Sequence, residues 1–188
     1  LHGMVQLPGL PVQRLMAEST LAYGSLDSVS LLDADNEHGA FLSPLLLTNN
    51  TPFTSEAVHS VEAFGPVSTI MPYRNMDEAI ALSKKGKGSL CSSIVSSDPN
   101  IFREYVMGAG TYHGRMLVLN ESSYKESTGH GSPLPLLVHG GPGRAGGGEE
   151  MGGIRGVKHY MQRVAIQGSP GDISAITNVY QQHAPGKQ

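Results

Sequence analysis

The glycine-rich segment 136–153, LLVHGGPGRAGGGEEMGG, has the residue pattern most open to a chemical interpretation. Eight of the fifteen residues after Val138 are glycine. Gly141, Gly143 and Gly146 satisfy the spacing G-x-G-x-x-G, which in dinucleotide-binding proteins lets a helix N-terminus approach a pyrophosphate. Here further glycines follow, and each costs a helix about 1 kcal/mol relative to alanine. The spacing alone therefore gives little support to a dinucleotide loop.

The first part of the same segment, LLVHGGPG at 136–143, is similar to the oxyanion-hole loop of α/β-hydrolases. Backbone N–H groups of such a loop can stabilise a tetrahedral oxyanion. That chemistry also needs a nucleophile, which the fold supplies in a Gly-x-Ser-x-Gly turn. The motif occurs nowhere in the 188 residues, so HGGPG alone supports a small hydrolase.

A longer resemblance runs from about His38 to Gln167. The segments HGAFLSPLLL, EAFGPVSTI, DEAIALSKKGKGSLCSSIVSSD, GRMLVLN and HGGPGRAGGGEEMGG follow one another as in the C-terminal half of the aldehyde dehydrogenase superfamily. The most specific of them is E-x-F-G-P-V at 62–67. STGHGSPLP and GVKHYMQRVAIQGSP resemble most the ring-opened CoA-semialdehyde dehydrogenases of phenylacetate and benzoate degradation.

The resemblance implies a nicotinamide cofactor, NAD or NADP, and two residues that contact it. In the family, the glutamate at the position of Glu62 holds the hydroxyls of the nicotinamide ribose, and the phenylalanine at Phe64 packs against the nicotinamide ring. A carboxylate can accept two hydroxyl hydrogen bonds, and an aromatic wall orients the ring for hydride transfer.

The resemblance also implies a substrate tunnel. The glycine segment corresponds to the family's loop that closes the inner end of this tunnel, where His139 replaces the common phenylalanine. A titratable donor at that place suggests polar groups near the aldehyde of the substrate. Thr128 and His130 are expected in the preceding substrate loop. The glycines are then mainly structural, because they let backbones pass close to one another.

Catalysis in this family uses a cysteine thiolate and a glutamate base, both upstream of the EAFGPV segment. The 61 residues before Glu62 contain no cysteine. Cys91, the single cysteine, falls in an expected strand, where burial keeps a thiol inert, so we interpret it as structural. We expect no catalytic residue and no Rossmann domain in this chain, and no activity from it alone.

The chain begins with Leu1 and not with methionine, so we expect a fragment of a longer dehydrogenase. The parent enzyme would oxidise a CoA-linked semialdehyde with NAD(P). The alternative is a truncated, non-catalytic interaction module, which the missing cysteine favours. It predicts stable self-association without turnover.

Hydrophobic periodicity and turn residues predict alternating strands and helices in the central part of the chain. The expected order is a strand at 67–73, a helix at 76–85, a strand at 89–97, a helix at 101–107 after Asp98 and Pro99, and a strand at 115–120. This βαβαβ run predicts an α/β fold with a parallel sheet. Residues 1–38 are expected to form short helices and loops.

A strand at about 163–166 and a helix from Asp172, with Ile173, Ile176 and Tyr180 on one side, are expected at the end of the chain. In the family this strand crosses to a neighbouring subunit, which implies a homo-oligomer and an unpaired strand edge here. We divide the chain into a poorly placed N-terminal segment 1–37, a catalytic-domain α/β core 38–157, and the oligomerisation strand with the C-terminal helix 158–188.

The composition gives no support to nucleic acid, a membrane or a metal ion as a binding partner. The net charge is −3, and no basic run marks a nucleic-acid or membrane-binding face. No apolar stretch approaches the roughly 18 residues that span a bilayer. The eight histidines form no recognisable metal motif, so we expect no metal. One cysteine suits the reducing cytoplasm, where we place the protein.

Overall fold

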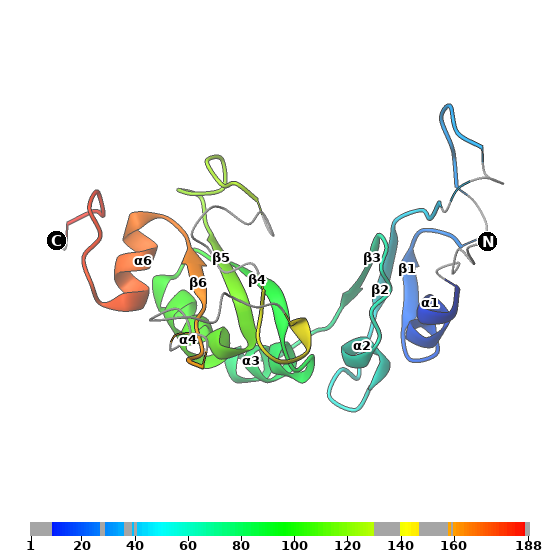
Figure 1. The fold of residues 1–188 in the computed structure, drawn as a ribbon, viewed down its shortest axis with the longest axis horizontal. Coiled ribbons are helices and arrows are strands. Elements are labelled where there is room, and N and C mark those ends of the chain that lie inside the picture. The colour runs from blue at the N-terminus through cyan, green and yellow to red at the C-terminus, as the bar shows by residue number, and fades with distance from the viewer. Residues whose placement is uncertain are drawn as a thin grey trace. The chain divides into compact units, whose positions relative to one another are not determined.

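The structure is a computed structural model that describes residues 9–26, 29–35, 39, 41–129, 140–146, 158 and 160–186. The chain forms two compact units, residues 1–73 and residues 74–188 (Figure 1). Each unit has its own sheet of three strands. None of the described helices is long and apolar enough to cross a bilayer.

The first unit contains the helices α1 and α2 and the sheet β1-β2-β3. Its elements are α1 Gly9–Met16, β1 Thr20–Tyr23, β2 Leu45–Thr48, α2 Ala57–Ser60 and β3 Val67–Ile70. β1 runs antiparallel to β2, and β3 runs parallel to β2. Leu15, Leu47 and Ala57 form the buried cluster of this unit, against which Val61 and Ala63 pack. This cluster fixes the chain just before β3.

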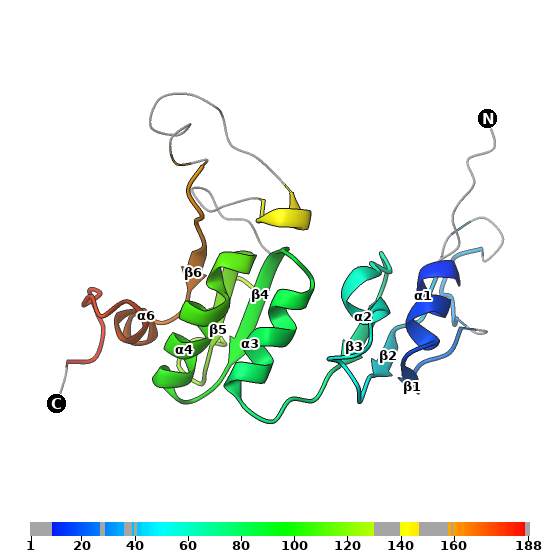
Figure 2. The same cartoon turned by 90° about the horizontal axis from the view of Figure 1, so that it is seen from below.

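The second unit contains a parallel sheet in the order β4-β5-β6. Its elements are α3 Met76–Lys85, β4 Ser89–Val95, α4 Pro99–Ala109, the 3₁₀ turn η1 Gly110–Tyr112, β5 His113–Leu119, the 3₁₀ turn η2 Gly143–Ala145, β6 Ala165–Gln167 and α6 Pro170–Thr177. α3 and α4 cover the same face of the sheet (Figure 2). α6 packs against α4.

Local capping explains where these helices begin. The side chain of Asn75 accepts from the Glu78 N–H at 3.0 Å before α3, and Asp98 accepts from the Asn100 N–H at 2.8 Å before α4. Each cap satisfies one of the N–H groups that a helix leaves unpaired at its start. Pro99 occupies the first turn of α4, where its missing N–H costs nothing.

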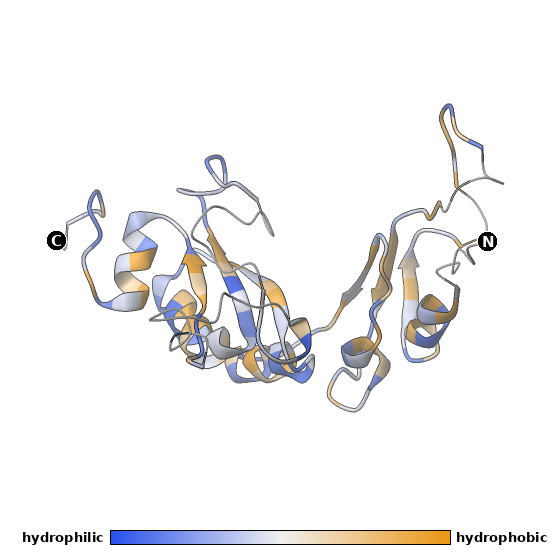
Figure 3. Ribbon diagram, in the orientation of Figure 1, coloured by the Kyte–Doolittle hydropathy of each residue, from blue (hydrophilic) through white to orange (hydrophobic). Residues whose placement is uncertain are grey.

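The core of the second unit lies between α4, β5 and α6. Phe102 is fully buried there against residues of β5 such as Met116 and Val118 and against Ile176 of α6. Hydrophobic residues concentrate on the elements that meet at this core (Figure 3). All of β5 but its last residue is buried, as expected for a strand with a neighbour on each side.

The prediction of an α/β fold with a parallel sheet is confirmed, with differences in pairing. The strand expected at 67–73 is β3, which pairs with β2 and not with the strands after it. The strand β1, the strand β2 and the helix α2 were not expected. Tyr180 lies beyond the end of α6 and is exposed, because Asn178 adopts a left-handed conformation that ends the helix.

The strand expected near the C-terminus is present as β6. It pairs in parallel with β5 of the same chain, with Arg115 opposite Ala165 and Leu117 opposite Gln167. The sequence predicts an unpaired strand edge here, but one edge of β6 is paired within the chain. The N–H and C=O groups of β5 are its partners. The crossing of this strand to a neighbouring subunit stays a prediction.

Candidate functional site

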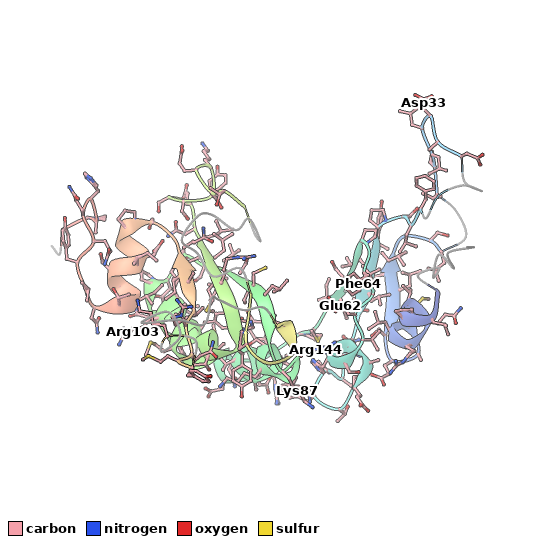
Figure 4. All side chains as sticks on the ribbon, viewed as in Figure 1. Asp33, Glu62, Phe64, Lys87, Arg103 and Arg144 are labelled. Atoms are coloured by element: carbon pink, nitrogen blue, oxygen red, sulfur yellow. The ribbon has the colours of Figure 1, made fainter. Side chains whose placement is uncertain are left out.

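The segment between α2 and β3 displays the two expected cofactor contacts. Val61 and Ala63 pack against the buried cluster of the first unit, whereas Glu62 and Phe64 between and after them are exposed. Burial therefore alternates along residues 61–64. Figure 4 marks Glu62 and Phe64 close together beside β3. A carboxylate and an aromatic ring are thus both exposed on this segment.

Phe64 combines high exposure with an unfavourable backbone conformation. Its side chain is 89% exposed, and its φ is +44°. Holding a non-glycine residue in such a region costs about 1–3 kcal/mol, and strain of this kind recurs at ligand-binding sites. Two backbone hydrogen bonds fix the residues that follow Phe64. The Val67 N–H donates to Gly65 O at 2.8 Å, and the Leu45 N–H donates to Pro66 O at 2.8 Å.

The glycine loop 140–146 packs directly on the start of β4. A Cβ atom added to Gly141 would lie 2.4 Å from Ser89 O, and one added to Gly143 would lie 2.2 Å from Lys87 O. The Arg144 N–H donates to Lys87 O at 3.1 Å, and Figure 4 labels these two residues near each other. The expectation that the glycines allow close backbone packing is confirmed for Gly141 and Gly143.

The same loop uses its N–H groups internally. Gly141 donates to Gly146 O at 2.8 Å, Ala145 to Pro142 O at 3.1 Å, and Gly146 to Gly143 O at 3.3 Å. Donors already paired with carbonyl groups do not converge on a phosphate or an oxyanion. In the described part of the loop, the geometry therefore favours a packing role over a cradle or an oxyanion hole.

A pocket of about 360 Å³ lies at the carboxyl ends of β5 and β6. The last residues of β5, the loop 122–128 and the segment 167–170 line it, and Glu126 is the one charged residue among them. Thr128, expected in the substrate loop, is one of the lining residues. Ligands of parallel α/β sheets commonly bind at this end of the strands. His130 and His139 lie outside the described residues.

A buried hydrogen-bond network supports the floor of this pocket. Asp172 is 4% exposed, and its Oδ2 accepts from Asn120 Nδ2 at 2.7 Å and from Ser169 Oγ at 2.6 Å. The network joins the end of β5 to the start of α6. The spacing of Ser169 and Asp172 is that of a helix-capping pair, but no local pattern links them to Asn120.

His113 is a buried titratable residue at the start of β5. It is 4% exposed, and its Nδ1 lies 2.7 Å from Ser89 Oγ. Its Nε2 has no hydrogen-bond partner within the described parts of the chain. Burial disfavours the charged imidazolium and lowers the pKa of His113 below its ordinary value.

This burial predicts a pH dependence of stability. The unfolded chain binds a proton near pH 6.5, above the lowered pKa of the folded state, so unfolding becomes easier as the pH falls through that window and changes no further below it. The slope is expected to reach at most about 1.4 kcal/mol per pH unit. Amide exchange of β5 measures it, and His113→Gln should remove the slope while the exposed control His183→Gln keeps it. A slope that persists in His113→Gln contradicts the assignment.

Comparison with known proteins places these features in a family. The sequence profile described as "Aldehyde dehydrogenase family" matches residues 15–166. The chain belongs to the aldehyde dehydrogenase family. The match contains both the EAFGPV segment and the glycine loop.

Two relatives from this comparison are similar over most of the chain. "Protein MaoC" of Klebsiella aerogenes is 57% identical over 138 residues, which are 73% of this chain and 41% of the relative. "3,4-dehydroadipyl-CoA semialdehyde dehydrogenase" of Aromatoleum evansii is 36% identical over 129 residues, which are 69% of this chain and 25% of the relative. The aligned residues thus span less than half the length of either relative.

Cys91 lies in β4 of this aldehyde dehydrogenase chain. It is half-buried and pairs with Arg115 across the sheet, and Ser89 Oγ donates to its carbonyl at 3.1 Å. Its structural role stays a prediction. Within the residues that the structure describes, no three His, Cys, Asp or Glu side chains are grouped as a metal site would require.

Proposed function

We propose that this chain is the C-terminal portion of an NAD(P)-dependent aldehyde dehydrogenase that oxidises a CoA-linked semialdehyde to the acid during degradation of phenylacetate or benzoate. The observation that carries the proposal is the exposed, strained Phe64 beside the exposed Glu62 in a family-specific segment. The substrate class is supported by the 36% identity to a relative named as a CoA-semialdehyde dehydrogenase.

The residues of the segment suit the nicotinamide end of the cofactor. Glu62 would accept the two ribose hydroxyls on its carboxylate, and Phe64 would form a wall against the ring. When bound, the cofactor accepts a hydride from the substrate. Ala63, between them, packs against the buried cluster of the first unit and so restrains the backbone from which both side chains project. The segment thereby orients the ring.

The remaining roles are divided between this chain and the rest of the enzyme. Thr128, with His130 and His139, would line the substrate tunnel, while the nucleophilic cysteine, the base and the dinucleotide-binding domain would come from the other part of the protein. Cys91 would stay a packing residue. We also propose a cytoplasmic homo-oligomer in which the strand β6 takes part in assembly.

The test of this function is an assay of the intact protein that contains the chain. A CoA-linked semialdehyde is supplied with NAD or NADP, and reduced nicotinamide and the acid product are measured. The proposal predicts equal amounts of the two products. Stable self-association without any cofactor reduction would overturn it and favour the alternative of a non-catalytic interaction module.

A further inference from the structure

The helix α2, which leads into the segment with Glu62 and Phe64, is too short to be stable alone. It comprises the four residues Ala57–Ser60, and forming one isolated turn is unfavourable in water. The residue at its N-cap, Glu56, makes no side-chain capping hydrogen bond. The N–H groups at the start of this helix therefore depend on an acceptor from elsewhere in the chain.

Glu18 supplies that acceptor from 38 residues earlier in the sequence. Its Oε2 accepts from the Glu56 N–H at 2.8 Å and from the Ala57 N–H at 2.8 Å. A carboxylate at this place satisfies two N–H groups of the turn. One side chain thus holds the first turn of α2.

Glu18 is itself held in place by a buried amide. Asn49 is 1% exposed, and its Nδ2 donates to the Glu18 carbonyl at 2.8 Å and to Ser55 Oγ at 2.9 Å. Because Ser55 comes directly before Glu56, Asn49 joins both sides of the cap. A buried polar group with these partners is costly to move, so it fixes the backbone of Glu18, from which the carboxylate reaches the start of α2.

The far end of the same turn leads to the cofactor contacts. The Val61 N–H donates to Ala57 O at 2.9 Å, and Glu62 follows directly. Phe64 keeps its unfavourable φ only while the surrounding structure imposes it. A loss of the helical turn α2 would therefore loosen the backbone that holds Phe64 at this φ.

We propose that Glu18 is a positioning residue that acts through α2 on Glu62 and Phe64, and so sets the affinity for the nicotinamide cofactor. This inference rests on the proposed function, because it takes these two residues as the cofactor contacts. Glu18 does not touch the cofactor in this account. Its effect is to keep one conformation of the segment populated.

The test compares three variants of the intact dehydrogenase. Glu18→Ala removes the cap and is expected to raise the KM for the cofactor about fivefold, with kcat and the KM for the aldehyde within about twofold. Glu18→Gln keeps an acceptor oxygen and should restore most of the affinity. Glu104→Gln, an exposed glutamate on α4, is the control and should resemble the wild type. A cofactor KM within about twofold of the wild type in Glu18→Ala overturns the proposal.

Amide exchange in the same variants separates this proposal from the function on which it rests. Glu18→Ala is expected to speed exchange of the Val61 N–H, while Glu104→Gln should leave it unchanged. Unchanged exchange at Val61 overturns the positioning role whether or not the enzyme is active. Failure of the wild type to reduce the cofactor overturns the proposed function instead. If Glu18→Ala does not fold, Glu18→Asp, which shortens the side chain, takes its place in both measurements.

Discussion

Replacing Gly114 by alanine is expected to lower the free energy of unfolding of the second unit by about 3 kcal/mol or more. A Cβ atom at this position would lie 1.9 Å from Gly140 O and 2.9 Å from Leu90 O. Both obstacles are backbone atoms and cannot rotate away. Since β5 has a paired strand on each side, relief requires the glycine loop or β4 to move.

Gly86 provides the matched control for this substitution. It has a φ of −68°, and a Cβ added there meets nothing within 4 Å. Gly86→Ala is therefore expected to be neutral or to stabilise by up to about 1 kcal/mol, since alanine restricts the unfolded chain. Amide protection of β4 and β5 measures both variants. Equal protection in Gly114→Ala and Gly86→Ala would show that the loop does not pack on β5 as described.

Much of the second unit could be predicted from the sequence because its signals are local. The expected bounds of the helix 76–85 agree with α3, and Asp98 with Pro99 marked the start of α4 correctly. These signals are caps, a proline and an apolar periodicity, all within one or two turns. The strand β2 was missed because a short apolar run such as LLLT does not distinguish a strand from a buried helix.

The candidate site was predictable only in part. The motif EAFGPV indicated Glu62 and Phe64 as candidate site residues. No residue pattern predicts a φ of +44° at a phenylalanine. The cap from Glu18 could not be predicted from the sequence because its partners lie 38 and 39 residues away. The same holds for Asn120 and Asp172, which are 52 residues apart. Such contacts depend on the tertiary fold and not on spacing.

Glu62→Gln is expected to raise the KM for the nicotinamide cofactor of the intact dehydrogenase roughly tenfold to a hundredfold. The substitution keeps the size of the side chain and removes the negative charge that we propose accepts the ribose hydroxyls. Hydrogen bonds to charged groups are about twice as strong as those between neutral groups, which is the source of the loss. The KM for the aldehyde should change less than about threefold, because Glu62 is not expected to touch that substrate.

We propose above that the EAFGPV segment of this chain holds the nicotinamide end of the cofactor. The measurement that tests it most directly is the dissociation constant of NAD(P) for the intact protein, compared between the wild type, Glu62→Gln and the exposed control Glu104→Gln. Weaker binding is expected in Glu62→Gln alone. Equal dissociation constants in all three proteins would contradict it.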